Sequence, residues 1–237
     1  MKKHGKRFQD ANKLIDSDRT FTLSEAINLI GQMQRPRFDE SLELHLRTNS
    51  DPRHADQMVR GVAMLPHGLG KSVRVLVFAN GEDAETARNA GADYVGDDDL
   101  ISQIESGWVG FDVGLATPDM MSKIGKLGRV LGRRGLMPNP RTGTMVPGRD
   151  LPRTIEEAKM GRVEYRMDRT AIIHAHVGKV SFSNEQLTEN IASLIDAINK
   201  SRPSGIKGSF VRTAFITTTM GPSIKLDVAD LLSIKVE

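Results

Sequence analysis

The chain of 237 residues has no cysteine, no long apolar run and a net charge of only +3. Without cysteine it can form neither a disulfide nor a thiolate zinc site, and it has no cysteine nucleophile, which fits a reducing cytoplasm. No apolar stretch approaches the roughly 20 residues of a membrane-spanning helix, so we expect no membrane contact. The basic residues 1–7 precede no apolar segment and therefore do not predict a secretory signal.

The charge is distributed unevenly along the chain. Residues 1–71 carry 12 Lys and Arg against 9 Asp and Glu, residues 72–158 carry 10 against 13, and residues 159–237 carry 11 against 8. If the two basic ends fold together, they form a cationic body that suits a nucleic acid. The acidic middle would repel phosphate.

Both ends of the chain predict helices packed on strands. Thr22 and Glu25 have capping-box spacing, which predicts a helix that ends at Pro36. From Phe38 the apolar residues alternate, which is typical of a strand with one wet face. A second capping box begins a helix at Ser183. Further strands are predicted over residues 163–167, 172–177, 210–219 and 224–228.

The middle of the chain has a different pattern. Residues 73–79 are almost continuously apolar, which indicates a strand buried on both faces. Short helices over 82–90 and 100–105 alternate with strands over 92–95 and 111–116, which favours βαβ units and a parallel sheet. Residues 123–153, rich in Gly, Pro and Arg, are predicted to form a loop.

These patterns predict two domains, one of them discontinuous. The first is an α+β domain with an antiparallel sheet and helices, built from residues 1–67 plus 159–237. The second, residues 68–158, is an inserted three-layer α/β domain of Rossmann-like type.

Two glycine-rich segments resemble nucleotide loops but lack required residues. Gly70-Lys71-Ser72 matches the end of a phosphate loop, yet the required earlier glycine is Leu65, and the segment precedes a strand. GRVLGRRG, residues 128–135, has Val130 in place of the middle glycine of a dinucleotide fingerprint. An α/β nucleotide-binding enzyme is therefore the disfavoured alternative, and we expect no cofactor.

No catalytic or metal constellation accompanies these segments. His174 and His176 lie two apart on a predicted strand and so share a face, but zinc needs a third ligand that no motif supplies. Neither a Ser-His-Asp signature nor a G-x-S-x-G elbow is present. We expect no metal and no catalytic residue.

The segment Thr217–Thr218–Thr219–Met220–Gly221 predicts a strand that runs into a turn. Its hydroxyls can hydrogen-bond phosphate or sugar oxygens, its glycine permits close approach of another backbone, and its methionine offers an apolar patch. On these residues alone, binding remains one alternative to a plain strand edge and turn.

Five segments then point to a known family: PHGLGK (66–71), GADYVG (91–96), ATPDMM (116–121), LGRVLGRRGLMPNPRTGT (127–144) and TTTMGPS (217–223). Together, in this order, they resemble the ribosomal protein L-one family in its bacterial form. The resemblance implies a two-domain fold whose first domain binds large-subunit ribosomal RNA. It further implies a part in movement of tRNA through the exit site and repression of the protein's own operon messenger RNA.

The resemblance also implies which residues contact RNA, and we expect no catalytic role for any of them. They are Arg37, Phe38, Ser41, His174, Gly178, Lys179, Thr213, Thr219, Met220 and Gly221. Hydroxyls and a glycine amide suit 2′-hydroxyls and phosphates, apolar side chains suit the sugar-base edge, and cations supply the salt-dependent part of the affinity.

This chain departs from the family pattern at three positions. Ala171 stands where the family usually has Gly, and His176 and Arg133 stand where it usually has Pro. The partners implied are ribosomal RNA, the operon messenger, exit-site tRNA and other ribosomal components of the cytoplasm. A free translational repressor without a ribosomal role is an alternative that would use the same surface.

Overall fold

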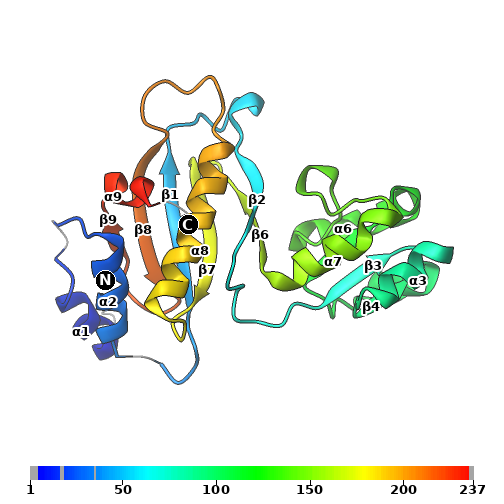
Figure 1. Ribbon diagram of the computed structural model, residues 1–237, viewed down its shortest axis with the longest axis horizontal. Coiled ribbons are helices and arrows are strands. Elements are labelled where there is room, and N and C mark those ends of the chain that lie inside the picture. The colour runs from blue at the N-terminus through cyan, green and yellow to red at the C-terminus, as the bar shows by residue number, and fades with distance from the viewer. Residues whose placement is uncertain (1–4, 17–18, 35, 235–237) are drawn as a thin grey trace. The chain divides into compact units, whose positions relative to one another are not determined.

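The computed structural model describes residues 5–16, 19–34 and 36–234 (Figure 1). The chain is a mixed α/β protein that forms two compact units. Unit 1 comprises Met1–Gly70 and Val163–Glu237, and unit 2 comprises Lys71–Arg162. The boundaries between the two units fall after residues 70 and 162, whereas the sequence analysis places the domain boundaries after residues 67 and 158.

Unit 1 is built on a four-stranded sheet with the order β7-β1-β8-β9, in which neighbouring strands are antiparallel. The strands are β1 (Ser41–Thr48), β7 (Ile172–Lys179), β8 (Val211–Thr218) and β9 (Ile224–Leu226). Leu42, Leu44 and Leu46 are buried, so the alternating pattern of the sequence is confirmed. A separate two-stranded sheet pairs β2 (Arg60–Met64) with β6 (Arg162–Arg166).

Two amphipathic helices cover one face of the larger sheet: α2 (Leu23–Gln32) and α8 (Asn184–Lys200) (Figure 1). Both begin at the predicted capping boxes, at Thr22 and Ser183. Ile27, Ile191 and Ile195 pack with the strand leucines in one hydrophobic core. The described residues of unit 1 also form three short helices: α1 (Lys6–Lys13), η1 (Ala55–Gln57) and α9 (Val228–Ser233).

The last strand is shorter than predicted. It ends at Leu226 instead of residue 228, because the side chain of Asp227 accepts a hydrogen bond from the backbone N–H of Ala229 and begins α9.

Unit 2 is a three-stranded parallel sheet, order β4-β3-β5, between two layers of helices, and the predicted parallel pairing is confirmed. Its main elements are β3 (Val75–Phe78), α3 (Gly81–Asn89), β4 (Tyr94–Gly96), α4 (Asp98–Glu105), β5 (Val113–Ala116) and α7 (Leu151–Met160). Val75 and Val77 pack with α3 and α7, whereas Leu76 and Phe78 pack with α4 and the helical turns that follow β5. β3 is therefore buried on both faces.

The prediction of a loop over residues 123–153 is wrong for much of that segment. It contains helical turns because Ile124, Leu127 and Leu131 recur at helical spacing and are buried against the sheet. After η2 (Pro118–Met120), which precedes the segment, the turns are α5 (Met121–Ile124), η3 (Gly125–Leu127), α6 (Gly128–Leu131), η4 (Gly132–Arg134), η5 (Pro140–Thr142) and η6 (Gly148–Asp150). No helix of the described residues is long and apolar enough to cross a membrane.

Candidate nucleic-acid interface

The face of the unit 1 sheet that α2 and α8 leave uncovered carries polar side chains, and we call it the open face. Ser41, Glu43, His45 and Arg47 alternate with the buried leucines of β1. In register with them are Thr213, Phe215 and Thr217 on β8, and His174, His176 and Lys179 on β7. The sheet therefore displays hydroxyls, imidazoles and cations from three neighbouring strands on one rigid surface.

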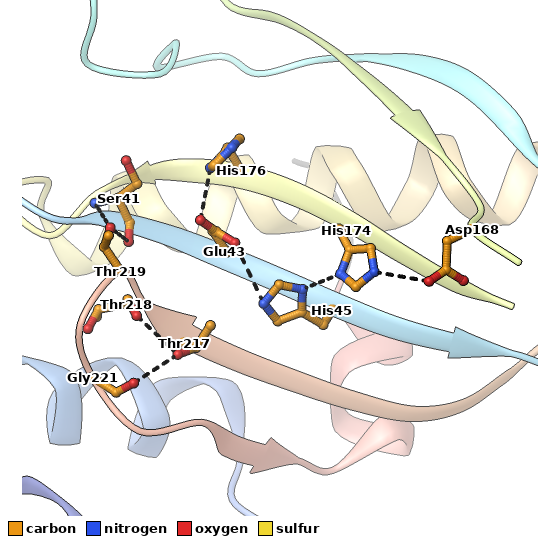
Figure 2. Close-up of polar contacts among 10 residues, drawn as sticks. All are labelled: Ser41, Glu43, His45, Asp168, His174, His176, Thr217, Thr218, Thr219 and Gly221. Atoms are coloured by element: carbon orange, nitrogen blue, oxygen red, sulfur yellow. Dashed lines mark hydrogen bonds and ion pairs between the residues drawn. The ribbon is translucent and has the colours of Figure 1, made fainter. Parts of the chain in front are cut away.

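One end of the open face is formed by residues 219–221, which we call the Thr-Met-Gly turn (Figure 2). The backbone N–H of Ser41 donates to Oγ1 of Thr219 at 3.0 Å, and the backbone N–H of Thr219 donates to the carbonyl of Ser41 at 3.1 Å. Thr217 donates through its hydroxyl to the carbonyl of Thr218 at 3.1 Å. The hydroxyl of Thr219 thus holds the start of β1, a structural role that the sequence pattern did not indicate.

The buried carboxylate of Glu40 also holds this turn through hydrogen bonds. Glu40 is 6% exposed, and its Oε1 accepts hydrogen bonds from the backbone N–H of Met220 at 2.8 Å and from the hydroxyl of Thr218 at 3.3 Å. The side chain of Met220 remains 52% exposed. Sequence reasoning missed Glu40, because an acidic residue just before a strand ordinarily indicates a solvated surface.

Gly221 and Gly178 are explained by packing within unit 1. A Cβ at Gly221 would lie 2.4 Å from Oγ1 of Thr218, so a side chain there would displace a buried group. Gly178 is buried, with φ of 153°, and a Cβ there would meet Phe182 at 3.0 Å and Leu187 at 3.1 Å. Gly178 therefore faces the core and presents no surface on the open face.

Three further residues assigned by resemblance lie around the start of β1: exposed Arg37 and Phe38, and half-buried Lys179. Phe38 is 52% exposed and Arg37 is exposed, both just before β1. Lys179 lies opposite Ser41 in the register and donates through Nζ to the hydroxyl of Ser41 at 3.0 Å. An aromatic ring, a thioether and an ammonium group are thus grouped around one end of β1.

The remaining two predicted residues lie away from this group. Thr213 pairs with Arg47 near the other end of β1, and His174 pairs with His45 between the two ends. Six residues separate Thr213 from Thr219, which is about 20 Å along an extended strand. Of the ten residues assigned by resemblance, seven therefore lie at the end of the open face near the Thr-Met-Gly turn. Gly178 is buried, and His174 and Thr213 lie farther along the strands.

A chain of polar contacts joins histidines and carboxylates across the middle of the open face (Figure 2). Nδ1 of His45 and Nδ1 of His174 are 2.9 Å apart, and Nε2 of each faces a carboxylate, Glu43 at 3.7 Å and Asp168 at 3.5 Å respectively. His176 adds a contact of 3.5 Å to Glu43. Within the described residues, no group of three His, Cys, Asp or Glu could hold a metal ion.

The pKa values of two residues in this row of polar contacts, His45 and Asp168, are shifted by their surroundings. Burial lowers the pKa of His45, and repulsion from His174 acts in the same direction while Glu43 opposes it. Burial alone would raise the pKa of Asp168. Hydrogen bonds from the backbone of Ile172 and from Thr170 outweigh burial and lower that pKa to about 2.

The two glycine-rich segments have structural settings that do not match a nucleotide loop. The carbonyl of Gly68 accepts a hydrogen bond from the side chain of buried Asn190 at 3.0 Å, which ties residues 66–70 to α8. Residues 128–134 are helical turns packed on the sheet of unit 2. Neither segment is a strand-to-helix loop that would cradle a phosphate.

Comparison with known proteins gives consistent results. Residues 30–222 match the model of the Ribosomal protein L1p/L10e family. The chain is 54% identical over 225 residues to the large ribosomal subunit protein uL1 of Dehalococcoides mccartyi, covering 95% of each chain. It is 55% identical over 230 residues to uL1 of Thermomicrobium roseum, covering 97% of this chain and 95% of that one. With uL1 of Chloroflexus aggregans it shares 51% identity over 236 residues, which is 99% of this chain and 100% of that one.

Proposed function

Because the chain belongs to the ribosomal protein L1 family, we propose that it binds large-subunit ribosomal RNA through the Thr-Met-Gly turn and the open face of unit 1. It is a protein of the large subunit of the cytoplasmic ribosome, in a family that is not one of enzymes. The observation that carries the proposal is the group of exposed Met220 and Phe38 with half-buried Lys179 near the start of β1, at a turn that Glu40 and Ser41 hold in place.

The chemistry of this group suits folded RNA. Exposed Phe38 and Met220 offer flat apolar surface to a sugar or base edge, and the turn offers hydroxyls to 2′-hydroxyls and phosphates. Lys179 and Arg37 add the salt-dependent attraction to phosphate. Since buried contacts fix the turn before binding, little ordering entropy opposes association.

We further propose the finer roles that the family resemblance implies. The same surface would bind a similar fold in the operon messenger and so repress translation, and the protein would assist movement of exit-site tRNA. The two units would act as separate domains, with RNA affinity in unit 1. The excess of cations at both chain ends and of anions in the middle supports this division.

A filter-binding titration of the full chain against large-subunit ribosomal RNA fragments tests the proposal. Phe38→Ala and Met220→Ala remove exposed side chains and should each weaken binding at least tenfold. Met160→Ala, which truncates a 61% exposed methionine of unit 2, is the matched control and should change affinity less than twofold. Equal binding by all four proteins would contradict the assignment of the surface.

Co-sedimentation separates the ribosomal role from a free repressor. The wild-type chain should sediment with large subunits, and Met220→Ala should shift to the free fraction at the same salt concentration. A chain that binds messenger RNA but never sediments with subunits would support the repressor alternative.

A further inference from the structure

A pocket of about 460 Å³ lies at the end of the unit 1 sheet away from the Thr-Met-Gly turn. Its wall comes from the end of β1, the loop after it, the turn between β6 and β7, and the start of β8. Four arginines line it: Arg47, Arg53, Arg169 and Arg212. Arg47 also lies on the open face, whereas the other three guanidinium groups come from segments that are not part of the proposed RNA surface.

None of these arginines forms an ion pair with a residue that the structure describes. Elsewhere in unit 1, cations pair with carboxylates, as Arg19 does with Glu25 at 2.6 Å. Asp51 is the acidic residue of the pocket wall, and its Oδ1 accepts the backbone N–H of Arg53 at 3.0 Å. Four guanidinium groups against the single carboxylate of Asp51 leave the pocket wall with an excess of positive charge, which favours an anion in the pocket.

Two further groups in the wall support a bound oxyanion. The guanidinium of Arg212 donates to Oδ1 of Asn49, which holds that arginine in place. Ser50 is 6% exposed, and its buried hydroxyl has no hydrogen-bond partner in the described part of the chain. A buried hydroxyl without a partner is costly, so a ligand oxygen that it could meet would be favourable.

The pocket and the turn lie on the same strand. Arg47 is on the open face, six residues from Ser41, which is about 20 Å along β1. Thr213, assigned to RNA contact by resemblance, pairs with Arg47 beside the pocket. One RNA that lies along the open face therefore reaches both ends.

We propose that this arginine pocket binds backbone phosphates of the same RNA that the Thr-Met-Gly turn contacts. The inference rests on the proposed function and adds a second anchor to it. Arginine suits this role, because its planar guanidinium donates two parallel hydrogen bonds to a phosphate. The pocket supplies affinity that is independent of base identity, while the turn reads the shape of the RNA.

The test measures RNA affinity of the full chain across a range of salt concentrations. Arg47→Gln combined with Arg169→Gln should weaken binding about tenfold at low salt. It should also reduce the slope of log K against log salt by about 1.5, since each lost phosphate contact removes roughly 0.7–0.9. Arg129→Gln combined with Arg134→Gln, two exposed arginines of unit 2, should alter neither quantity. Circular dichroism checks folding, and Arg53→Gln replaces the double variant if that one is unfolded.

The outcomes distinguish this proposal from the proposed function. If the pocket variants keep both affinity and salt slope while Met220→Ala weakens binding, the pocket is not a phosphate site although the RNA surface stands. If the wild-type chain binds no ribosomal RNA, both proposals are rejected. Loss of affinity without a change of slope would also overturn the pocket assignment, because phosphate contacts must alter the salt dependence.

Discussion

The carboxylate of Glu40 accepts a hydrogen bond of 2.8 Å from the backbone N–H of Met220, a residue 180 positions away in the sequence. The same oxygen accepts the hydroxyl of Thr218. Through these two bonds a buried acidic side chain holds the backbone of the exposed methionine next to the start of β1, where Thr219 bonds Ser41.

Removal of that carboxylate should weaken both stability and RNA binding. Glu40→Ala leaves two donors in a buried site without an acceptor, which costs roughly 1–3 kcal/mol of unfolding free energy. Glu40→Gln keeps one oxygen acceptor and should lose less. Urea unfolding measures the stability. RNA affinity, measured without urea on folded protein, should also fall more for Glu40→Ala than for Glu40→Gln. Equal stability of Glu40→Ala and wild type would show that the bonds contribute nothing.

Gly221 should not tolerate a side chain while Thr218 keeps its hydroxyl. The Cβ of Gly221→Ala would lie 2.4 Å from Oγ1 of Thr218, so the buried threonine must move. We expect a loss of about 1–3 kcal/mol of unfolding free energy. Thr218→Ala removes the clashing oxygen, so the double variant should lose less than the sum of the two single variants. A double-mutant cycle by urea unfolding measures this coupling, and strict additivity would contradict the predicted clash.

Ala171→Gly should stabilise the chain. Ala171 has φ of 63°, the left-handed region that costs a residue with a side chain roughly 1–2 kcal/mol. The greater freedom of glycine in the unfolded chain offsets part of this, so a gain of about 0.5–1 kcal/mol remains. Ala175→Gly, in the extended backbone of β7, is the control and should destabilise. Thermal unfolding monitored by circular dichroism should show opposite changes of Tm for the two variants.

Asp168 should make stability depend on acid pH. Its pKa is about 2 in the folded chain against an ordinary 3.8, so the unfolded chain binds the proton more readily. The stabilisation is therefore complete above about pH 5 and is lost as the pH falls toward 2. Because its side chain is 38% exposed, solvent screening limits the contribution to about 1 kcal/mol. Asp112 of unit 2 also has a pKa of about 2, so the measurement is the difference between wild type and Asp168→Asn. That difference should shrink between pH 5 and pH 2.

The sequence by itself determined the helices and strands that depend on interactions between residues close together along the chain. The capping boxes at Thr22 and Ser183 satisfy backbone groups within three residues, and both helices begin there. The alternation of β1 and the apolar run of β3 follow from the period of a strand and the faces that it buries. The helical spacing of residues 124–131 was also present in the sequence, but glycines and arginines between the leucines concealed it.

Only the tertiary structure decided how the site is assembled. The sequence shows the Thr-Met-Gly segment but does not show that Glu40 lies beneath it, that Gly178 faces the core, or that four arginines from separate segments share a pocket. These relationships join residues far apart along the chain, and the antiparallel register of β1 with β7 and β8 brings them together. Local propensity acts over a few residues, whereas register and burial depend on the packing of the whole sheet against its helices.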